Sequence, residues 1–367
     1  MFSQNNKISI RQIEILMILN LFSNTSLILP RIASELAGGD GWIIVIGGGI
    51  ISVIYILIIT TLAKMFPNQN IIEYTEVIFN KPIAIIIGVI FCLKLIIFAG
   101  LEMRVFGELI KQTLLRNTPI EIIMITMLFV VTYITRKGYE ARARLAEFLI
   151  FFILVPIIFI FLFIIPDVKL YNISPILVTK PKTLLYGSFI MSFAYSGMEL
   201  LLLATPFVAK PNKLTKVGLR SVVFVGILNT IICILTIGAF GPLETSRQIW
   251  PVMTIMQMIH LPGALIQRQD ALMMSFWIMI VFLLINGYLY FSGLIIKKIA
   301  QIKEQNFLIL PLLPIVYLIA LTPNNIVETY EWLMIITRYV SILFLVVIPL
   351  ILLIAAKMKG MGQGEEK

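Results

Sequence analysis

The sequence is poor in the residues that most catalytic and metal sites need. It holds one histidine, His260, and two cysteines, Cys92 and Cys233, in 367 residues. Four-ligand metal sites draw mainly on Cys and His, and a disulfide framework needs several Cys pairs. We therefore expect no cofactor, no metal, no disulfide framework and no His-based catalysis, and we predict that the chain is not an enzyme. His260 is expected to be an ordinary interfacial residue.

Charge is also scarce, whereas long hydrophobic runs are abundant. Only 13% of residues are charged, against roughly 25% in soluble domains, and 59% are hydrophobic. The hydrophobic runs recur from near residue 8 to residue 356, which leaves no room for a folded soluble domain. The sequence thus predicts an all-α polytopic membrane protein in which residues 1–367 form a single membrane domain.

The hydrophobic runs predict ten transmembrane helices, at about 20 apolar residues per crossing. The first run is long, is interrupted by polar residues and lacks a small-residue cleavage site, so we interpret it as a span and not as a signal peptide. The expected ranges are 9–33, 42–66, 83–114, 119–135, 146–166, 184–206, 217–240, 263–296, 307–322 and 328–356.

The positive charges predict the orientation in the membrane. Most of the 29 Lys and Arg residues lie at one set of span ends, with concentrations near 136–144 and 210–220. Because short loops rich in Lys and Arg stay in the cytoplasm, both termini are predicted to be cytoplasmic, including the short tail 357–367. The net charge of +10 is accordingly interpreted as a topology signal, and no nucleic-acid site is expected.

The stretch LFSNTSLILP, residues 21–30, places four small polar residues inside the first span and ends on Pro30. A broken helix is tolerated in a membrane where protein or a water-filled cavity surrounds the break, and Ser, Asn and Thr are helix-capping residues. The alternative is a continuous helix whose Ser and Thr bond to their own backbone and whose Asn contacts a neighbour. The four residues are Ser23, Asn24, Thr25 and Ser26.

The sixth span repeats this polar-then-proline order. Residues 192–208 read SFAYSGMELLLLATPFV, with Ser196, Gly197 and Glu199 at midspan and Pro206 beyond. Paired interrupted spans in the two halves of a chain indicate an inverted-repeat transporter fold with its site at the midplane. We therefore predict a five-plus-five inverted repeat with broken helices 1 and 6, the repeats covering 9–166 and 184–356.

Two such breaks suit a zwitterion. The N-terminal end of the outer half of span 1 can hold a carboxylate, and the C-terminal end of the first half of span 6, with Glu199 beside it, can hold an ammonium. An amino acid is the ligand that this chemistry predicts. Glu199 has a second interpretation, because Ser196-Gly197-Met198-Glu199 also matches a capping box.

Span 3 carries Lys94, Glu102, Arg104 and Glu108. Arg104 and Glu108 have the i,i+4 spacing of a helical ion pair. Lys94 either substitutes for a coupling cation or snorkels to the cytoplasmic interface, and Glu102 is deeper, with no obvious local partner. Charged residues at membrane depth are functional candidates by default, so Lys94, Glu102 and Glu199 are candidates for ion or proton coupling.

Two further groups of residues have simple structural interpretations. In span 8, Asn286, Tyr288 and Tyr290 are individually interpreted as contacts between helices or interface anchors, although one face of the helix is placed to line a cavity. Residues 47–49, GGG, lack the Lys-Ser/Thr of a phosphate loop and lie inside span 2. Close helix packing is therefore predicted there.

Several segments resemble the spore germination permease family, the membrane B subunits of nutrient germinant receptors. The resemblance covers residues 8–356, and its FAYSGMEL segment also links the chain to the amino acid/polyamine/organocation transporters, whose fold is a five-plus-five inverted repeat. The segments are ISIRQIEILMILNLFSNTSLILP with AGGDGW (8–30 and 37–42), FAYSGMEL, WPVMTIMQMI (250–259) and RQDALMMSFW (268–277).

The resemblance implies a subunit that recognises a small nutrient and acts with an A subunit and a lipoprotein C subunit in the spore inner membrane. Carried over by position, the ligand lies between Asn24-Thr25-Ser26 and Tyr195-Ser196-Gly197-Met198, with Gly100, Asn286 and Tyr290 at its edges. The polar stretch in span 1 departs from the Gly-rich break usual in the transporter relatives.

Two functions follow as hypotheses. The first is a receptor subunit that binds a nutrient and signals to partner subunits, and the second is a proton-coupled amino acid permease. A purely structural anchor is a weaker third hypothesis, because it would not need two broken spans.

Overall fold

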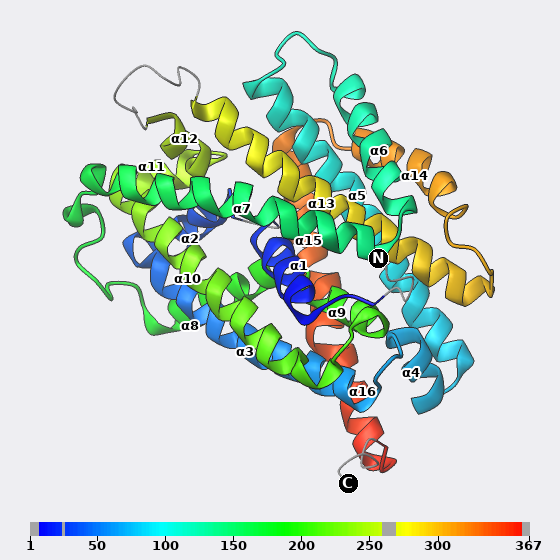
Figure 1. The fold of residues 1–367 in the computed structure, drawn as a ribbon. Coiled ribbons are helices and arrows are strands. Elements are labelled where there is room, and N and C mark those ends of the chain that lie inside the picture. The colour runs from blue at the N-terminus through cyan, green and yellow to red at the C-terminus, as the bar shows by residue number, and fades with distance from the viewer. Residues whose placement is uncertain (1–6, 24–25, 259–268, 362–367) are drawn as a thin grey trace.

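The computed structural model describes residues 7–23, 26–258 and 269–361, so His260, Asn24 and Thr25 lie outside the described residues. The described chain is built of helices and connecting loops (Figure 1). The α-helices are α1 Ile10–Ser23, α2 Leu29–Ala37, α3 Gly41–Met65, α4 Ile71–Ile78, α5 Lys81–Thr113, α6 Ile120–Arg136, α7 Tyr139–Ile164, α8 Pro181–Ser192, α9 Leu201–Ala204, α10 Leu214–Phe240, α11 Pro242–Arg247, α12 Pro251–Met258, α13 Gln269–Ala300, α14 Ile309–Leu321, α15 Ile326–Ile336 and α16 Ile348–Met358.

The apolar helices make this a multi-pass membrane protein. Within the described residues, five helical stretches are long and apolar enough to cross a bilayer, and a sixth is the pair 181–195 and 198–207, which is bent by 44° at its break. Side chains such as Ile50 and Leu93, 65% and 54% exposed, point outward from these stretches, as expected where the surroundings are lipid. The five stretches are 29–65, 81–113, 211–240, 274–300 and 326–358.

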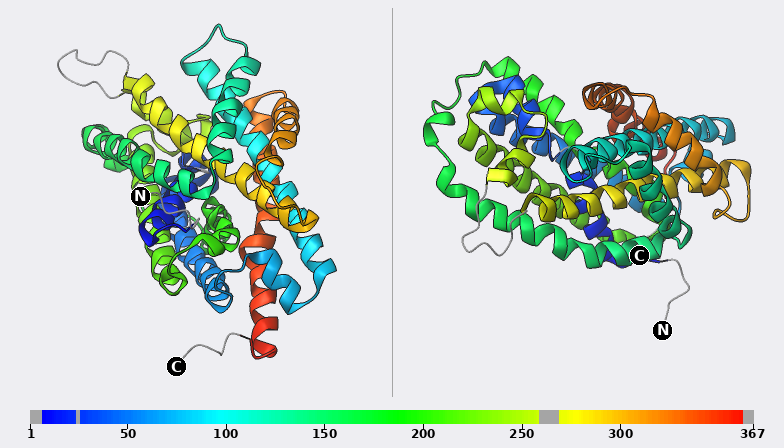
Figure 2. Two further views of the ribbon diagram at one scale, coloured as in Figure 1. Left: turned by 45° about the vertical axis from the view of Figure 1, so that its right-hand side comes forward. Right: turned by 90° about the horizontal axis from the view of Figure 1, so that it is seen from above.

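The helices form two neighbouring groups. In Figure 1, α3, α8 and α10 lie on one side of the molecule and α5, α6, α13 and α14 on the other, an arrangement that the turned views in Figure 2 preserve. Helix α1 packs against α10 of the first group and against α13 and α7. The first broken helix therefore lies between the two groups.

Asparagine caps fix the starts of three helices. Asn70 accepts the backbone N–H groups of Ile72 and Glu73, and Glu73 returns the contact by accepting the Asn70 N–H at 2.9 Å. Asn80 and Asn325 cap α5 and α15 in the same way. Such caps satisfy backbone donors that a helix start leaves free, which explains why these helices begin where they do.

The glycines at 47–49 bring α3 against α8. A Cβ on Gly47 would lie 2.1 Å from the Ser188 Oγ, and one on Gly48 would lie 2.7 Å from the Met191 backbone. Only hydrogen fits at these two positions, so the prediction of close helix packing is confirmed.

The prediction of a positively charged loop at 136–144 needs a correction. Helix α6 ends at Arg136 and α7 begins at Tyr139, so Lys137 and Gly138 alone connect them. Arg142 lies within α7 and is 1% exposed. A residue interpreted from its neighbours as a surface charge is in fact buried.

Candidate functional site: the two helix breaks

The first span is broken where its polar residues predict. Helix α1 ends at Ser23, a turn covers 26–28, and α2 begins at Leu29 with Pro30 in its first turn. Proline suits that position because the first N–H groups of a helix have no partner within it. The Ser26 hydroxyl donates to the Phe22 carbonyl and lies 3.4 Å from the Asn229 Oδ1. The break in helix 1 is therefore confirmed, with Ser23 and Ser26 on its two sides.

The second break lies at Ser196 and Gly197. Helix α8 ends at Ser192, and after the 3₁₀ turn Phe193–Tyr195 the chain restarts at Met198–Leu200. Gly197 has φ = +110°, a conformation that side chains with a Cβ rarely adopt. Pro206 lies in the last 3₁₀ turn of this span, Thr205–Phe207. It therefore ends the span, whereas Pro30 starts a half-helix.

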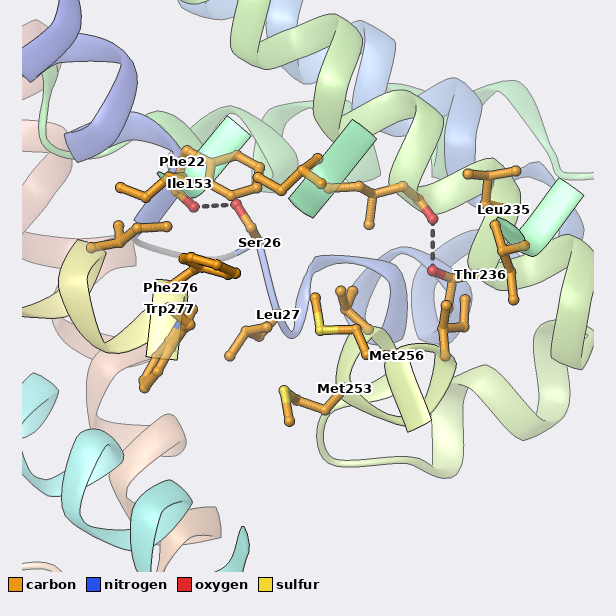
Figure 3. Close-up of a pocket in the computed structure, with 16 residues that line it drawn as sticks. Phe22, Ser26, Leu27, Ile153, Leu235, Thr236, Met253, Met256, Phe276 and Trp277 are labelled. Carbon is orange, nitrogen blue, oxygen red and sulfur yellow. Dashed lines mark hydrogen bonds between the residues drawn. The ribbon is translucent and has the colours of Figure 1, made fainter. Parts of the chain in front are cut away.

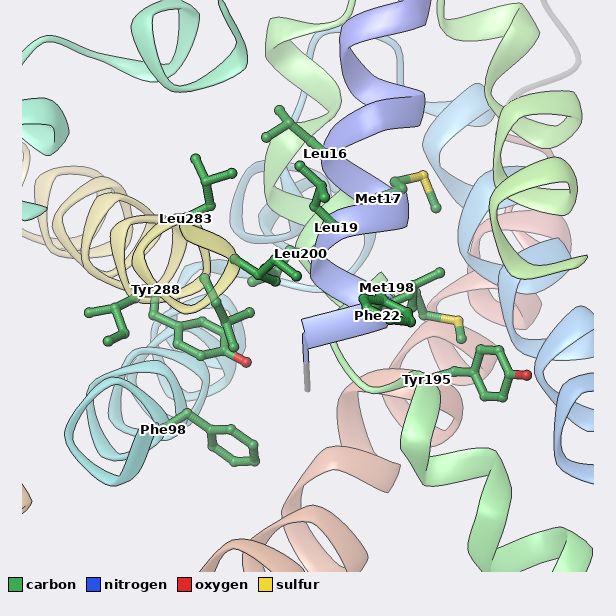
Figure 4. Packing of buried hydrophobic residues seen from close by; sticks show 14 of the residues in the cluster. Leu16, Met17, Leu19, Phe22, Phe98, Tyr195, Met198, Leu200, Leu283 and Tyr288 are labelled. Carbon is green, nitrogen blue, oxygen red and sulfur yellow. The ribbon is translucent and has the colours of Figure 1, made fainter. Parts of the chain in front are cut away.

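The two breaks meet through α1. A Cβ on Gly197 would lie 3.5 Å from the Asn20 carbonyl oxygen, one turn before the end of α1. Figure 4 shows Phe22 of α1 next to Met198, with Leu16, Leu19 and Leu200 close by. Phe22 and Met198 are 176 positions apart in the sequence, yet both belong to one buried hydrophobic cluster beside the two breaks.

Glu199 is held by three donors at the second break. It accepts the Gly197 N–H at 2.7 Å and the Ser196 hydroxyl at 3.3 Å, and it forms a salt bridge with the Lys94 ammonium. The capping box predicted for Ser196 and Glu199 is not formed, because the Ser196 N–H bonds the Phe193 carbonyl and Glu199 accepts the Gly197 N–H instead. The positive partner of this carboxylate is a side chain of α5.

Lys94 does not snorkel. Its side chain is 2% exposed, and its Nζ bonds Glu199 and lies 5.4 Å from the centre of the Phe98 ring. The interpretation as an interfacial lysine is therefore wrong, because the ammonium points to the helix break. The other interpretation of Lys94, a substitute for a coupling cation, stays a prediction.

The other acidic residues of α5 differ from each other. Glu108 pairs with Arg104 at 2.9 Å, as its spacing predicts, and Arg104 also donates to the Asn324 carbonyl at 3.1 Å. Glu102 is 4% exposed. Among the residues that the structure describes, its carboxylate has no hydrogen bond or salt bridge.

Three predicted edge residues contact other helices. A Cβ on Gly100 would lie 2.5 Å from Ile319, so Gly100 faces α14. The Asn286 amide donates to the Thr135 hydroxyl at 2.8 Å and so joins α13 to α6. Tyr290 packs in an aromatic cluster with Tyr139 of α7. Their contacts match the interpretation as links between helices.

Tyr195 points away from α1, as Figure 4 shows. A Cβ on Gly49 of α3 or on Gly226 of α10 would lie 3.0 Å from its hydroxyl. The ring therefore fills a slot between those two helices, while the Tyr195 backbone stays at the break.

Two polar groups at the breaks were missed by sequence reasoning. Arg142 donates to the Asn20 Oδ1 at 2.9 Å and to the Leu283 carbonyl at 3.2 Å, which ties α7 to α1 and α13. Ser341, in the π-helical turn Thr337–Ser341, lies 3.3 Å from Ser196 through the two hydroxyls. Asn20, the partner of Arg142, is a lone amide in an apolar run and could have been singled out from the sequence. Nothing in the sequence around Ser341 indicates its contact with Ser196.

A cavity of about 50 Å³ lies beside Ser26, as Figure 3 shows. Its walls are almost entirely apolar and include Phe22, Leu27, Met253 and Trp277. Ligand pockets usually measure roughly 300–1,000 Å³. This cavity is therefore a packing gap next to the first break and too small for a nutrient molecule.

Comparison with known proteins decides the family. Residues 7–329 match the family model described as spore germination protein. The chain belongs to this family. Its members are B-type, permease-like subunits and not enzymes. This confirms the predicted family and the prediction that the chain is not an enzyme.

The relatives match the chain along nearly its whole length. The spore germination protein YndE of Bacillus subtilis (strain 168) is 25% identical over 99% of this chain and 100% of its own length. Spore germination protein B2 of the same organism is 22% identical over 90% and 91%. GerLB of Bacillus cereus is 25% identical over 93% and 92%.

A solved structure shows the fold. The chain superposes on MhsT, crystallised in complex with L-phenylalanine, with a TM-score of 0.71, 12% identity and coverage of 92% of this chain and 87% of MhsT. The chain therefore has the same fold as MhsT. At this identity the likeness concerns the fold alone.

Proposed function

We propose that the chain is the membrane subunit of a spore nutrient germinant receptor, which binds a small nutrient and signals to partner subunits. One observation carries the proposal: a protein of a germination family keeps the two helix breaks of a transporter fold, and these breaks pack against each other at Asn20 and Gly197. A structural anchor would gain nothing from two interrupted helices at membrane depth.

The architecture that we propose has ten crossings. The repeats are 9–166 and 184–356, inverted relative to each other, with both termini in the cytoplasm and the chain in the spore inner membrane. The observed helices support this count, because within the described residues each expected range overlaps one helix or a helix pair. The proposed partners are the A subunit and the lipoprotein C subunit, which the resemblance implies.

The proposed nutrient is an amino acid held between the breaks. Its proposed contacts are Ser23–Ser26, the backbone of Tyr195–Glu199 and the Ser196 hydroxyl, with Gly100, Asn286 and Tyr290 further out. Because Lys94 already neutralises Glu199, we expect no sodium requirement. In the proposal, Lys94 and Glu199 form an ion pair within the protein, and the distance between them changes when the breaks change conformation.

The proposal is tested by filling the first break. In spores that carry Ser26→Met, the larger side chain displaces groups between the breaks. We expect at least a tenfold shift in the nutrient dose–response curve, or germination without nutrient where the filler mimics occupancy, because a ligand acts by favouring one of two conformations. Ser246→Met, at a half-buried position within α11, is the matched control. Unchanged dose–response at normal membrane levels of the Ser26 variant would contradict the proposal.

The fold likeness to MhsT favours a second candidate, a proton-coupled amino acid permease. Liposomes that contain only this chain separate the two candidates. The receptor proposal expects binding without concentrative uptake under an imposed proton gradient, and gradient-driven accumulation of an amino acid would favour the permease.

A further inference from the structure

A second cavity lies beside the two helix breaks, among α2, α8 and α15, and its lining includes Leu29 and Ala194. Its volume is about 270 Å³, close to the lower limit of ordinary ligand pockets, roughly 300 Å³. It runs from exposed residues, including Tyr186 and Arg338, to buried ones, including Ala194 and Glu102. The cavity therefore reaches the surface and ends at a carboxylate.

The sides of this cavity are apolar. Ile32 of α2, Ile190 of α8 and Leu333 of α15 are among the residues that line it. Such walls suit a hydrocarbon group, because removing apolar surface from water contributes about 25 cal/mol per Å².

The charges at the mouth are already engaged. Arg338 donates to the Tyr186 hydroxyl at 3.1 Å, and Glu35 pairs with Arg31 at 2.8 Å. Glu102 is different, since the described residues give its carboxylate no hydrogen bond or salt bridge. A buried carboxylate without a partner is costly, and a cationic ligand removes that cost.

Glu102 also connects this cavity to the first break. Together with Ser23 and Tyr330 it lines a narrow gap of about 10 Å³, and within the described chain the Ser23 hydroxyl has no hydrogen-bond partner. A group bound at Glu102 therefore lies next to the end of α1.

We propose that this cavity binds a small molecule with one ammonium group, which pairs with Glu102, and a short apolar body, which lies among Ile32, Ile190 and Leu333. An ionised carboxylate only accepts hydrogen bonds, so the site selects against anions. The inference rests on the proposed function and deepens it. Because Lys94 already pairs with Glu199, the ammonium of the nutrient pairs with Glu102 instead.

Binding of n-pentylammonium to the purified full chain in lipid nanodiscs tests the inference by calorimetry, with empty nanodiscs as the blank. We expect 1-pentanol and pentanoate, which share the apolar body, to bind at least tenfold more weakly. Glu102→Gln should weaken n-pentylammonium binding about 10- to 150-fold, the equivalent of a hydrogen bond to a charged group. Glu108→Gln, which changes a paired carboxylate of the same helix, should leave the affinity unchanged.

Ile32→Trp provides an independent variant that fills the cavity and keeps Glu102. It should abolish binding of n-pentylammonium. The inference is overturned if the wild-type chain binds no n-pentylammonium, if pentanol binds equally well, or if either the Glu102 or the Ile32 variant keeps full affinity. The two proposals can fail separately. If binding depends on Glu102 but the Ser26 variant germinates normally, this site is supported and the receptor proposal is rejected.

Discussion

At the scale of single residues, the Lys94–Glu199 pair is the most consequential contact. Its two side chains come from α5 and from the break after α8, and both are 2% exposed. Removing one member of a buried ion pair leaves an uncompensated charge in a medium that cannot solvate it. Glu199 would keep the Gly197 N–H and the Ser196 hydroxyl, whereas Lys94 would keep only aromatic neighbours.

We predict that Lys94→Met destabilises the folded chain by about 3–5 kcal/mol, the usual cost of breaking a buried pair. The double variant with Lys94→Met and Glu199→Gln should recover much of this loss, because no unpaired charge remains. Denaturant unfolding of the purified chain measures both. A double variant no more stable than the single one would show that the charge pairing is not what stabilises the break.

At the scale of elements, the contact between α3 and α8 depends on the absence of side chains. At Gly48 a Cβ would lie 2.7 Å from the Met191 backbone, an atom that moves only if the whole helix moves. Because α8 leads directly into the second break, its position fixes that of Ser196 and Gly197. The glycines singled out as superficially similar to a phosphate loop thus position the site through packing.

Gly48→Ala should therefore destabilise the chain by about 1–3 kcal/mol, the scale of overpacking, and weaken the nutrient response. Gly293→Ala in α13 is the matched control, because its nearest neighbour lies 3.4 Å away and alanine favours a helix more than glycine does. Thermal unfolding compares the two. Equal effects would mean that helix propensity, and not the close approach of α3 to α8, determines the outcome.

At the scale of the whole molecule, orientation is the property that follows from the distribution of charge. Orientation can be tested only at exposed positions. Arg142 is buried and unsuitable, whereas Lys137 and Asn212 are exposed. Cys92 and Cys233 are both buried, so the native background of labelling is expected to be low.

We predict that Lys137→Cys and Asn212→Cys resist a membrane-impermeant maleimide added from outside, because positively charged loops stay in the cytoplasm. Arg116→Cys, at an exposed position between α5 and α6, should react under the same conditions. Reaction at 137 or 212 in sealed membranes would contradict the proposed orientation.

The sequence by itself determined the helices and where they break. A helix in hydrocarbon satisfies its own backbone locally, so an apolar run, an asparagine cap at Asn70 or Asn325, and the left-handed glycine at 197 act within a few residues. For the same reason the polar stretch after Phe22, taken together with its counterpart in the sixth span, predicted the first break.

Only the tertiary structure decided which polar groups meet. Lys94 and Glu199, Arg142 and Asn20, and Ser341 and Ser196 are each more than 100 positions apart, and their pairing depends on how each helix is rotated and packed against its neighbours. The sequence places Lys94 and Glu102 within span 3, but it shows neither that both are buried nor which one has a partner. That distinction arises because one helix face turns Lys94 toward the second break while Glu102 faces the cavity beside α2.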